Sequence, residues 1–291
     1  TMHSLIFRQF ILLVITVGYL STSEAKTYAL VADGLIDGKV NNVLQDKAVI
    51  VTGNQIVAVI NIDHIPEEAI KIDLPGTTLM PGMINAHEHP LLYKSDYQNA
   101  HLQASSAYKA LLGLKNLQRL LRAGWTTIRV MGDGDVYYAN QDIRKVIDSG
   151  VFIGPRLTGA AHYISITGGG GDVNYFSPEQ TVIADGLIAD GPDEIRKAIR
   201  KEIKYGSDWI KIMVTGAFMS VGDNPRNVSF SPEELAAAID EASRHNIPVA
   251  AHAHATEGIN QAIIAGARSI EHGLSLIHIS EPTRLLSSSY A

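Results

Sequence analysis

Five histidines stand at spacings that can hold a metal ion. His87 and His89 form one His-x-His pair, His252 and His254 form a second, and His272 stands alone. Side chains alternate along a strand, so both imidazoles of a pair face the same side of it. The chain has no cysteine, so a metal would have to bind histidine and oxygen ligands. The spacing therefore indicates a candidate metal site built on imidazoles.

A further residue with possible chemistry, Lys211, lies inside the apolar run 209–214. A buried strand does not tolerate a lysine without a partner. Each feature also has an ordinary explanation, because a single lysine can reach the rim of a sheet and a single histidine pair can lie in a loop. Their combination on four separate predicted strands favours a common metal site.

The elements that would position these residues follow a regular order. From residue 82 onward strands alternate with helices, which is typical of a parallel sheet with helical crossovers. Six such units fill residues 82–274, about 32 residues each, close to the ~31 per unit of an eight-fold barrel. The expected strands are 82–87, 126–130, 156–158, 209–214, 248–252 and 269–272, and the expected helices are 106–122, 143–149, 192–205, 232–245 and 258–265.

The predicted fold class is α/β, an incomplete (β/α)8 TIM barrel with about six of its eight units. Barrel enzymes carry their chemistry at the carboxyl ends of the strands. The histidines and the lysine lie on predicted strands one, four, five and six. Ser231, Pro232 and Glu234 form a capping box, which predicts the start of the fourth helix between those strands.

The segment before the barrel has a different pattern. Residues 27–80 contain short alternating strands separated by turn residues such as those at 33–34, 37–38 and 53–54. This pattern predicts a small antiparallel sheet. We assign residues 26–81 to the N-terminal part of a small β-sandwich domain.

The first 25 residues are typical of a secretory signal peptide. Arg8 supplies a positive start, residues 10–20 form an apolar stretch of 11 residues, and 23–25 end it with a small-x-small pattern. A membrane anchor is the alternative, but the stretch falls short of the roughly 20 residues that span a bilayer. The expected location is therefore secreted or periplasmic, with no membrane association after removal of the signal.

Composition narrows the possible partners. The chain has 30 acidic and 24 basic side chains, a net charge of -6, and no run of basic residues. Nucleic-acid binding depends on clustered Lys and Arg, so a nucleic-acid partner is not expected. Nothing in the pattern fixes the oligomeric state, and a homo-oligomer stays open.

Several motifs together resemble those of a known family. Residues 79–89, which contain the first histidine pair, resemble the first-strand signature of the metal-dependent amidohydrolase superfamily, in particular its imidazolonepropionase-like and Xaa-Pro dipeptidase-like group. The resemblance extends from about residue 28 to 274. The further matching segments are 124–129, 166–169, 208–212, 251–254 and 270–273.

The resemblance implies a cofactor and a set of roles. It implies two divalent metal ions, zinc first among the candidates, with His87, His89, His252 and His272 as ligands and a carboxylated Lys211 bridging them. Manganese, cobalt or iron would also suit such ligands. Lys211 and His254 are then the expected catalytic residues, His254 also facing the substrate. The implied reaction is hydrolysis of an amide or cyclic amide by a metal-activated hydroxide, with a small molecule, a dipeptide or an N-acyl amino acid as substrate.

Two departures from the family pattern affect these expectations. Gly170 stands where the family often has a histidine; His162 and Tyr163 lie nearby and either bind substrate instead or simply line the loop of strand three. Residues 275–291 resemble translated adapter read-through, so we expect a non-native tail, with a natural short tail as the alternative. The family's strand-eight aspartate is then absent, and a catalytically inactive metal-binding fragment is the alternative function.

Overall fold

The computed structural model describes residues 25–274 of the 291-residue chain. The chain divides into two compact units between Pro81 and Gly82. The predicted tail and, except for Ala25, the predicted signal peptide lie outside the described residues. Within the described part of the chain, no helix has the length and apolar composition needed to cross a bilayer.

The smaller unit contains one four-stranded sheet. Its strands have the order β3-β2-β1-β4, and Ala29, Ala48 and Ile50 form a small buried cluster on it. The elements are β1 (Thr27–Leu35), β2 (Lys47–Thr52), β3 (Gln55–Asn61), the 3-10 turn η1 (Ile62–His64) and β4 (Ile70–Leu79).

The prediction of an antiparallel sheet is wrong at β4. Pairing is antiparallel between β1 and β2 and between β2 and β3, but β4 runs parallel to β1. After β3 the chain crosses to the opposite edge of the sheet, so β4 enters beside β1 in the same direction. Alternation of side chains shows which face a residue occupies but not the direction of the strand. Residues 25–81 show no second sheet, so the sandwich stays a prediction.

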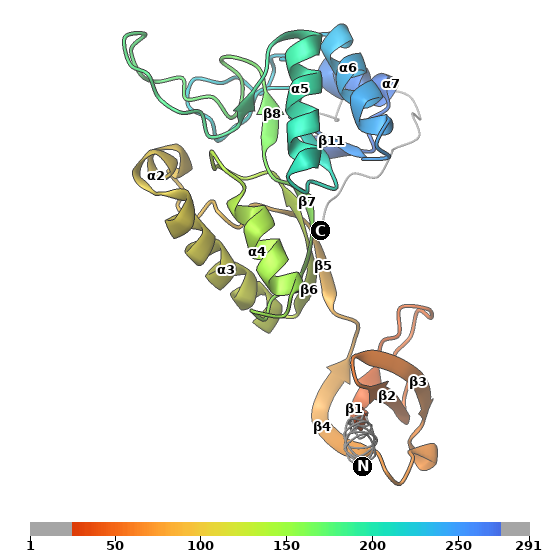
Figure 1. Ribbon diagram of the computed structural model, residues 1–291. Coiled ribbons are helices and arrows are strands. Elements are labelled where there is room, and N and C mark those ends of the chain that lie inside the picture. The colour runs from red at the N-terminus through yellow and green to blue at the C-terminus, as the bar shows by residue number, and fades with distance from the viewer. Residues whose placement is uncertain (1–24, 275–291) are drawn as a thin grey trace, which may run out of the picture. The chain divides into compact units, whose positions relative to one another are not determined.

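The larger unit alternates strands and helices, as predicted. Figure 1 shows α3 and α4 beside β5, β6 and β7. Its elements are β5 (Met83–Glu88), α2 (Tyr97–Gln103), α3 (Ser106–Arg122), β6 (Trp125–Met131), α4 (Ala139–Asp148), β7 (Arg156–Ala160), β8 (Tyr163–Ser165), β9 (Leu187–Ile188), α5 (Gly191–Lys204), β10 (Ile210–Met213), α6 (Pro232–Ser243), β11 (Val249–Ala253), α7 (Thr256–Ala265) and β12 (Ser269–His272).

The strands of this unit form two parallel sheets. One has the order β5-β6-β7, and the other has the order β12-β11-β10-β8-β9. The third predicted strand is thus divided, with β7 in the first sheet and β8 in the second. The α/β class with parallel strands is confirmed, and the arrangement is consistent with part of a TIM barrel. That the barrel is incomplete, with about six of its eight units, stays a prediction.

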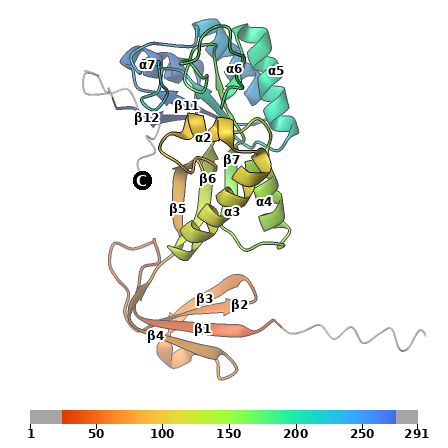
Figure 2. The same ribbon diagram turned by 90° about the vertical axis from the view of Figure 1, so that its left-hand side faces the viewer.

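Helices α5, α6 and α7 cover the second sheet side by side (Figure 2). Their apolar faces bury residues such as Ile195, Leu235 and Ile259 against Ile212 and its neighbours in the sheet. The predicted capping box is present: Ser231 Oγ accepts from the backbone N–H of Glu234 at 3.3 Å, and Glu234 Oε2 accepts from that of Ser231 at 2.8 Å. Because β10, β11 and β12 pair in parallel, their carboxyl ends lie at the same edge of the sheet.

Candidate functional site

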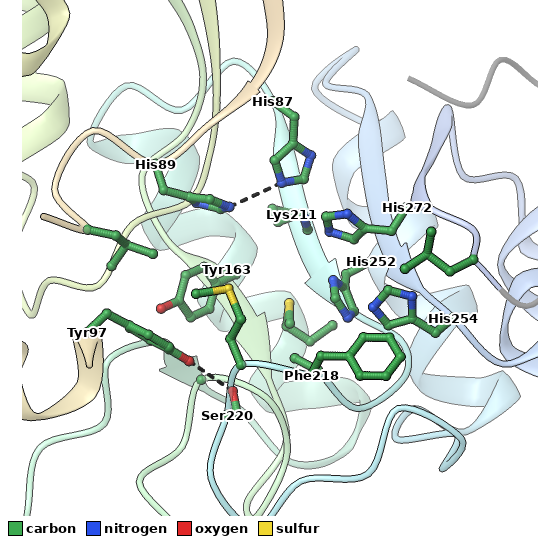
Figure 3. A pocket seen from close by; sticks show the side chains of 16 residues that line it. His87, His89, Tyr97, Tyr163, Lys211, Phe218, Ser220, His252, His254 and His272 are labelled. Atoms are coloured by element: carbon green, nitrogen blue, oxygen red, sulfur yellow. Dashed lines mark hydrogen bonds between the residues drawn. The ribbon is translucent and has the colours of Figure 1, made fainter. Parts of the chain in front are cut away.

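The predicted histidines gather around one cavity of about 340 Å³ at the carboxyl ends of β5, β10, β11 and β12. We call it the histidine pocket. Figure 3 shows five imidazole rings and the Lys211 side chain facing the same hollow. The imidazoles that line it are those of His87, His89, His252, His254 and His272.

The first histidine pair presents two ring nitrogens to each other. His87 Nδ1 lies 2.6 Å from Glu271 Oε2, and His89 Nδ1 lies 2.5 Å from the carbonyl oxygen of Gly132. Both partners only accept hydrogen bonds when Glu271 is ionised, so both Nδ1 atoms carry the hydrogen. A neutral ring then has a lone pair on Nε2, and the two Nε2 atoms lie 3.1 Å apart.

The second pair and His272 complete the group of rings. The His272 ring centroid lies 4.7 Å from that of His87 and 4.7 Å from that of His252. His252 Nε2 lies 3.2 Å from the carbonyl oxygen of Gly216, which leaves the lone pair of a neutral ring on Nδ1. His254 Nδ1 is buried without a hydrogen-bond partner. Burial without a partner costs free energy, so this atom is a candidate to accept a hydrogen bond from a bound ligand.

Burial keeps these rings uncharged. It lowers the pKa of His89 to about 3, helped by the nearby charges of His87 and Lys211, and it lowers the pKa of His272 to about 3, helped by Lys211. Burial and Lys211 also lower the pKa of His252 and of His254. At His87, burial lowers the pKa although the hydrogen bond to Glu271 opposes it. Neutral imidazole is the form that binds metals.

Lys211 lies in the middle of β10, as predicted, and its side chain is 2% exposed. Burial lowers its pKa to about 8, and the charge of Glu271 partly opposes this shift. A fraction of the amine is therefore neutral near pH 7, and a neutral amine is a nucleophile.

Glu271 links the two sheets beside the pocket. The side chain is fully buried; its Oε1 accepts from Arg129 Nη2 at 2.8 Å and from Ser269 Oγ at 2.6 Å. Burial would raise the pKa of this carboxyl, but the hydrogen bond to His87, the charge of Lys211 and the Ser269 and Arg129 contacts hold it below its ordinary value. The carboxylate is thus ionised beside His87.

The opposite wall of the pocket is apolar and aromatic. Tyr97 from α2 and Phe218 and Met219 from the loop after β10 line it. The Tyr97 hydroxyl lies 3.0 Å from Ser220 Oγ, which ties α2 to that loop (Figure 3). A small polar group with an apolar attachment fits such a pocket.

Tyr163 and His162, the two predicted substrate contacts, occupy different places. The Tyr163 ring lines the pocket, while its hydroxyl donates to the buried carboxylate of Asp185. His162 does not line the pocket: its Nδ1 lies 2.7 Å from Glu202 Oε1, and its ring packs edge-on against Tyr138. His162 is therefore placed to hold the β7–β8 connection on α5.

Sequence reasoning missed Glu271 and the apolar wall. Glu271 precedes His272, so strict alternation would place the two side chains on opposite faces. His272 has a φ of +72°, which breaks the alternation and lets both side chains contact His87. A buried glutamate in an apolar strand was the available signal. Phe218 and Met219 could have been found as an apolar pair just after a strand end.

The pocket residues fit a divalent metal ion. Among residues 25–274 no three histidine or carboxylate side chains form a ready-made metal cluster as they stand. Two lone pairs facing each other at 3.1 Å nevertheless repel unless a cation lies beside them. Two imidazole ligands on one tetrahedral zinc, at ~2.05 Å each, would stand about 3.3 Å apart. His87 and His89 therefore already have nearly the spacing of a ligand pair.

Comparison with known proteins finds relatives that match most of this chain. Ochratoxinase of Aspergillus niger is 31% identical in an alignment of 272 residues that covers 87% of this chain and 55% of the relative. Imidazolonepropionase of Klebsiella pneumoniae is 26% identical over 81% of this chain and 58% of the relative. A solved Xaa-Pro dipeptidase with methionine bound in its active site is 32% identical, with a TM-score of 0.77, over 85% of this chain and 62% of that one.

The chain thus spans little more than half the length of the curated relatives that it matches. The family profile described as "Amidohydrolase family" matches residues 78–286, which include every histidine of the pocket. Motif, fold and profile agree on the same strands, and the chain belongs to the Amidohydrolase family.

Proposed function

We propose that the protein is a metal-dependent hydrolase that cleaves amide bonds in small substrates, dipeptides or N-acyl amino acids. The observation that carries the proposal is the pair of Nε2 lone pairs of His87 and His89, 3.1 Å apart in a buried pocket. Family membership supports hydrolysis of a C–N bond, because ochratoxinase and an Xaa-Pro dipeptidase are among the relatives.

The proposed ligands come from both sheets of the larger unit. His87 and His89 would hold one of two divalent ions, zinc being the first candidate, and His252 and His272 would hold the other. Bound divalent ions of this kind lower the pKa of a bound water and polarise a carbonyl group. Imidazole and carboxylate-like oxygens suit zinc but also accept manganese, cobalt and iron.

Lys211 is proposed to act as a carbamate. Its buried amine, with a pKa of about 8, has a neutral fraction that can attack carbon dioxide. The amine nitrogen forms a C–N bond to carbon dioxide as one C=O π bond opens and its electron pair moves to oxygen. An N–H proton leaves to water, and the residue would carry an anionic oxygen in place of a buried cation. This change removes the cost of burying an ammonium group among five neutral imidazoles. The nearness of Lys211 to His89, His252 and His272, whose pKa values it lowers, supports this role.

The remaining pocket residues are proposed to bind the substrate. His254 has a buried Nδ1 without a partner and is the candidate for a hydrogen bond to the scissile group. Phe218, Met219 and Tyr97 would contact an apolar side chain of the substrate, and Tyr163 would add its ring. We do not propose His162 for this role, since its ring is held by Glu202 outside the pocket lining.

The test uses the full 291-residue chain, first as purified without added metal and then after incubation with zinc. Release of free amine from Leu-Pro and from Asp-Pro is measured, together with metal content by mass spectrometry. We expect zinc in the purified chain and faster release from Leu-Pro, because the pocket wall is apolar. Lys211→Ala should lose more than about 100-fold in rate, because removal of a ligand should cost more than the 10–100-fold typical of losing a ligand's hydrogen-bond partner.

Lys197→Ala is the matched control, because Lys197 is an exposed lysine on α5. Retention of most activity by Lys211→Ala would contradict the proposal. Bound zinc without amine release would instead support the alternative of a non-catalytic metal-binding protein. Absence of bound metal would contradict both functions.

A further inference from the structure

Glu271 contacts a proposed metal ligand from a different sheet. It lies on β12, while His87 lies on β5, and these strands belong to separate sheets of the larger unit. The carboxylate Oε2 and His87 Nδ1 are 2.6 Å apart, and the Glu271 side chain is fully buried. A contact of this length between a buried carboxylate and a partly buried ring fixes both the position of the ring and the nitrogen that carries the hydrogen.

The other carboxylate oxygen is held by two donors. Arg129 Nη2 donates to Oε1 at 2.8 Å, and Ser269 Oγ donates at 2.6 Å. Arg129 is itself fixed, because its Nε donates to the carbonyl oxygen of Ala86 at 2.6 Å and its guanidinium lies 4.5 Å from the centre of the Trp209 ring. Glu271 therefore has a single orientation in which Oε2 faces His87.

The backbone is shaped for this contact. His272 takes a φ of +72°, a left-handed conformation that a histidine rarely adopts. Because of it, the adjacent side chains of Glu271 and His272 both reach His87, one by a hydrogen bond and the other by a ring contact at 4.7 Å. Regular alternation would have turned one of them away.

We propose that Glu271 is a positioning residue, which holds His87 in the tautomer with hydrogen on Nδ1 and so presents the Nε2 lone pair next to that of His89. Arg129 is the residue that holds the carboxylate in place. The inference rests on the proposed function, because it assigns Glu271 a task in metal binding. The inference goes beyond the proposed function because Glu271 would contact neither the metal nor the substrate.

Glu271→Gln is the sharpest variant, because it keeps shape and changes hydrogen-bonding character. Arg129 needs an acceptor, so the glutamine carbonyl would turn to Arg129 and its amide N–H would face His87. His87 Nδ1 must then accept, and its hydrogen moves to Nε2, where it blocks the metal. We expect zinc affinity, measured by competition with a chromophoric chelator, to fall 10- to 100-fold.

Glu241→Gln is the matched control. Glu241 is also a buried glutamate held by an arginine, with Arg200 Nε at 2.6 Å, but it lies on α6 away from the pocket lining. Glu241→Gln should keep the zinc affinity of the unaltered chain within about 3-fold, while it loses about as much thermal stability as Glu271→Gln. Equal affinity losses in both variants, or no loss in Glu271→Gln, would overturn the inference.

A second measurement does not depend on metal or turnover, and it uses a variant only for assignment. The ¹⁵N resonances of His87 in the metal-free, unaltered chain report its tautomer, with His87→Gln used to assign them. We expect the Nδ1–H tautomer; an Nε2–H tautomer would refute the inference. Failure of the unaltered chain to bind zinc would refute the proposed function, while the tautomer would still decide whether Glu271 orients His87.

Discussion

Replacing Lys109 with methionine tests what holds α2 and α3 against the rest of the larger unit. The Lys109 side chain is 2% exposed, and its Nζ lies 2.8 Å from Asp135 Oδ1, 2.9 Å from the carbonyl oxygen of Gly134 and 3.1 Å from His101 Nδ1. The lysine thus ties α3, α2 and the loop after β6 together. Tyr97, which lines the histidine pocket, lies on the same α2.

The loss of unfolding free energy in Lys109→Met depends on the hydrogen bonds that Asp135 keeps. Removing one partner of a buried ion pair costs about 3–5 kcal/mol, because the other charge stays buried. Ser106 Oγ still donates to Asp135 Oδ2 at 2.7 Å, and methionine fills a similar volume, so we expect the lower end, about 3 kcal/mol. For a unit of this size, that loss lowers the melting temperature by roughly 6–12 °C.

The assay is thermal unfolding followed by circular dichroism, with Lys115→Met on the exposed face of α3 as control. Burial alone would raise the pKa of Asp135, but the hydrogen bonds from Lys109 and Ser106 lower this pKa by more. The pKa of Asp135 is therefore lower in the folded chain than in the unfolded chain. The pair's contribution is therefore full above about pH 4 and is lost as the pH falls through the folded pKa. A melting shift under 2 °C at pH 7, or an equal shift in Lys115→Met, would refute this reasoning.

Three further predictions concern other parts of the larger unit. Burial raises the pKa of Asp185 to about 6, so stability should fall by roughly 3 kcal/mol as the pH rises from 4 to 7, and Asp185→Asn should remove this dependence in urea titrations. If stability depended on pH in Asp185→Asn as it does in the unaltered chain, this prediction would be contradicted. Ser231→Ala breaks the capping box and should cost about 1 kcal/mol by thermal unfolding; no loss would mean that α6 does not depend on its cap. Zinc at 100 times its dissociation constant should stabilise the chain by about 2.7 kcal/mol, reversibly with chelator, and Lys211→Ala should show far less gain.

Local signals explain which elements the sequence could predict. The apolar run 209–214 contains β10, and the capping box marks the start of α6, because both depend on neighbouring residues. The three-residue β8 and the seven-residue α2 were missed, since neither is long enough to show a period. The direction of β4 was also missed because it depends on where the preceding connection crosses the sheet.

The histidine pocket could be predicted in part for the same reason. A His-x-His pair at a strand end places two rings on one face whatever the rest of the fold does, so His87, His89, His252 and His254 were found directly. Glu271 depends on the positive φ of His272, and Tyr97 depends on the packing of α2 near the loop after β10. Neither dependence is local, and alternation alone gives the wrong face for Glu271.

The proposed metal ligands and the contact between the two sheets involve the same residues. His87 and Arg129, from the sheet β5-β6-β7, both bond to Glu271 in the other sheet. His252 and His272 lie in that second sheet, so a metal pair held with His87 and His89 would join the same two sheets. Binding free energy would then add to the free energy of unfolding of the whole unit. Under the proposed function, Glu271→Gln would therefore weaken both the packing between the sheets and the affinity for metal, and the Glu241 control separates these two losses.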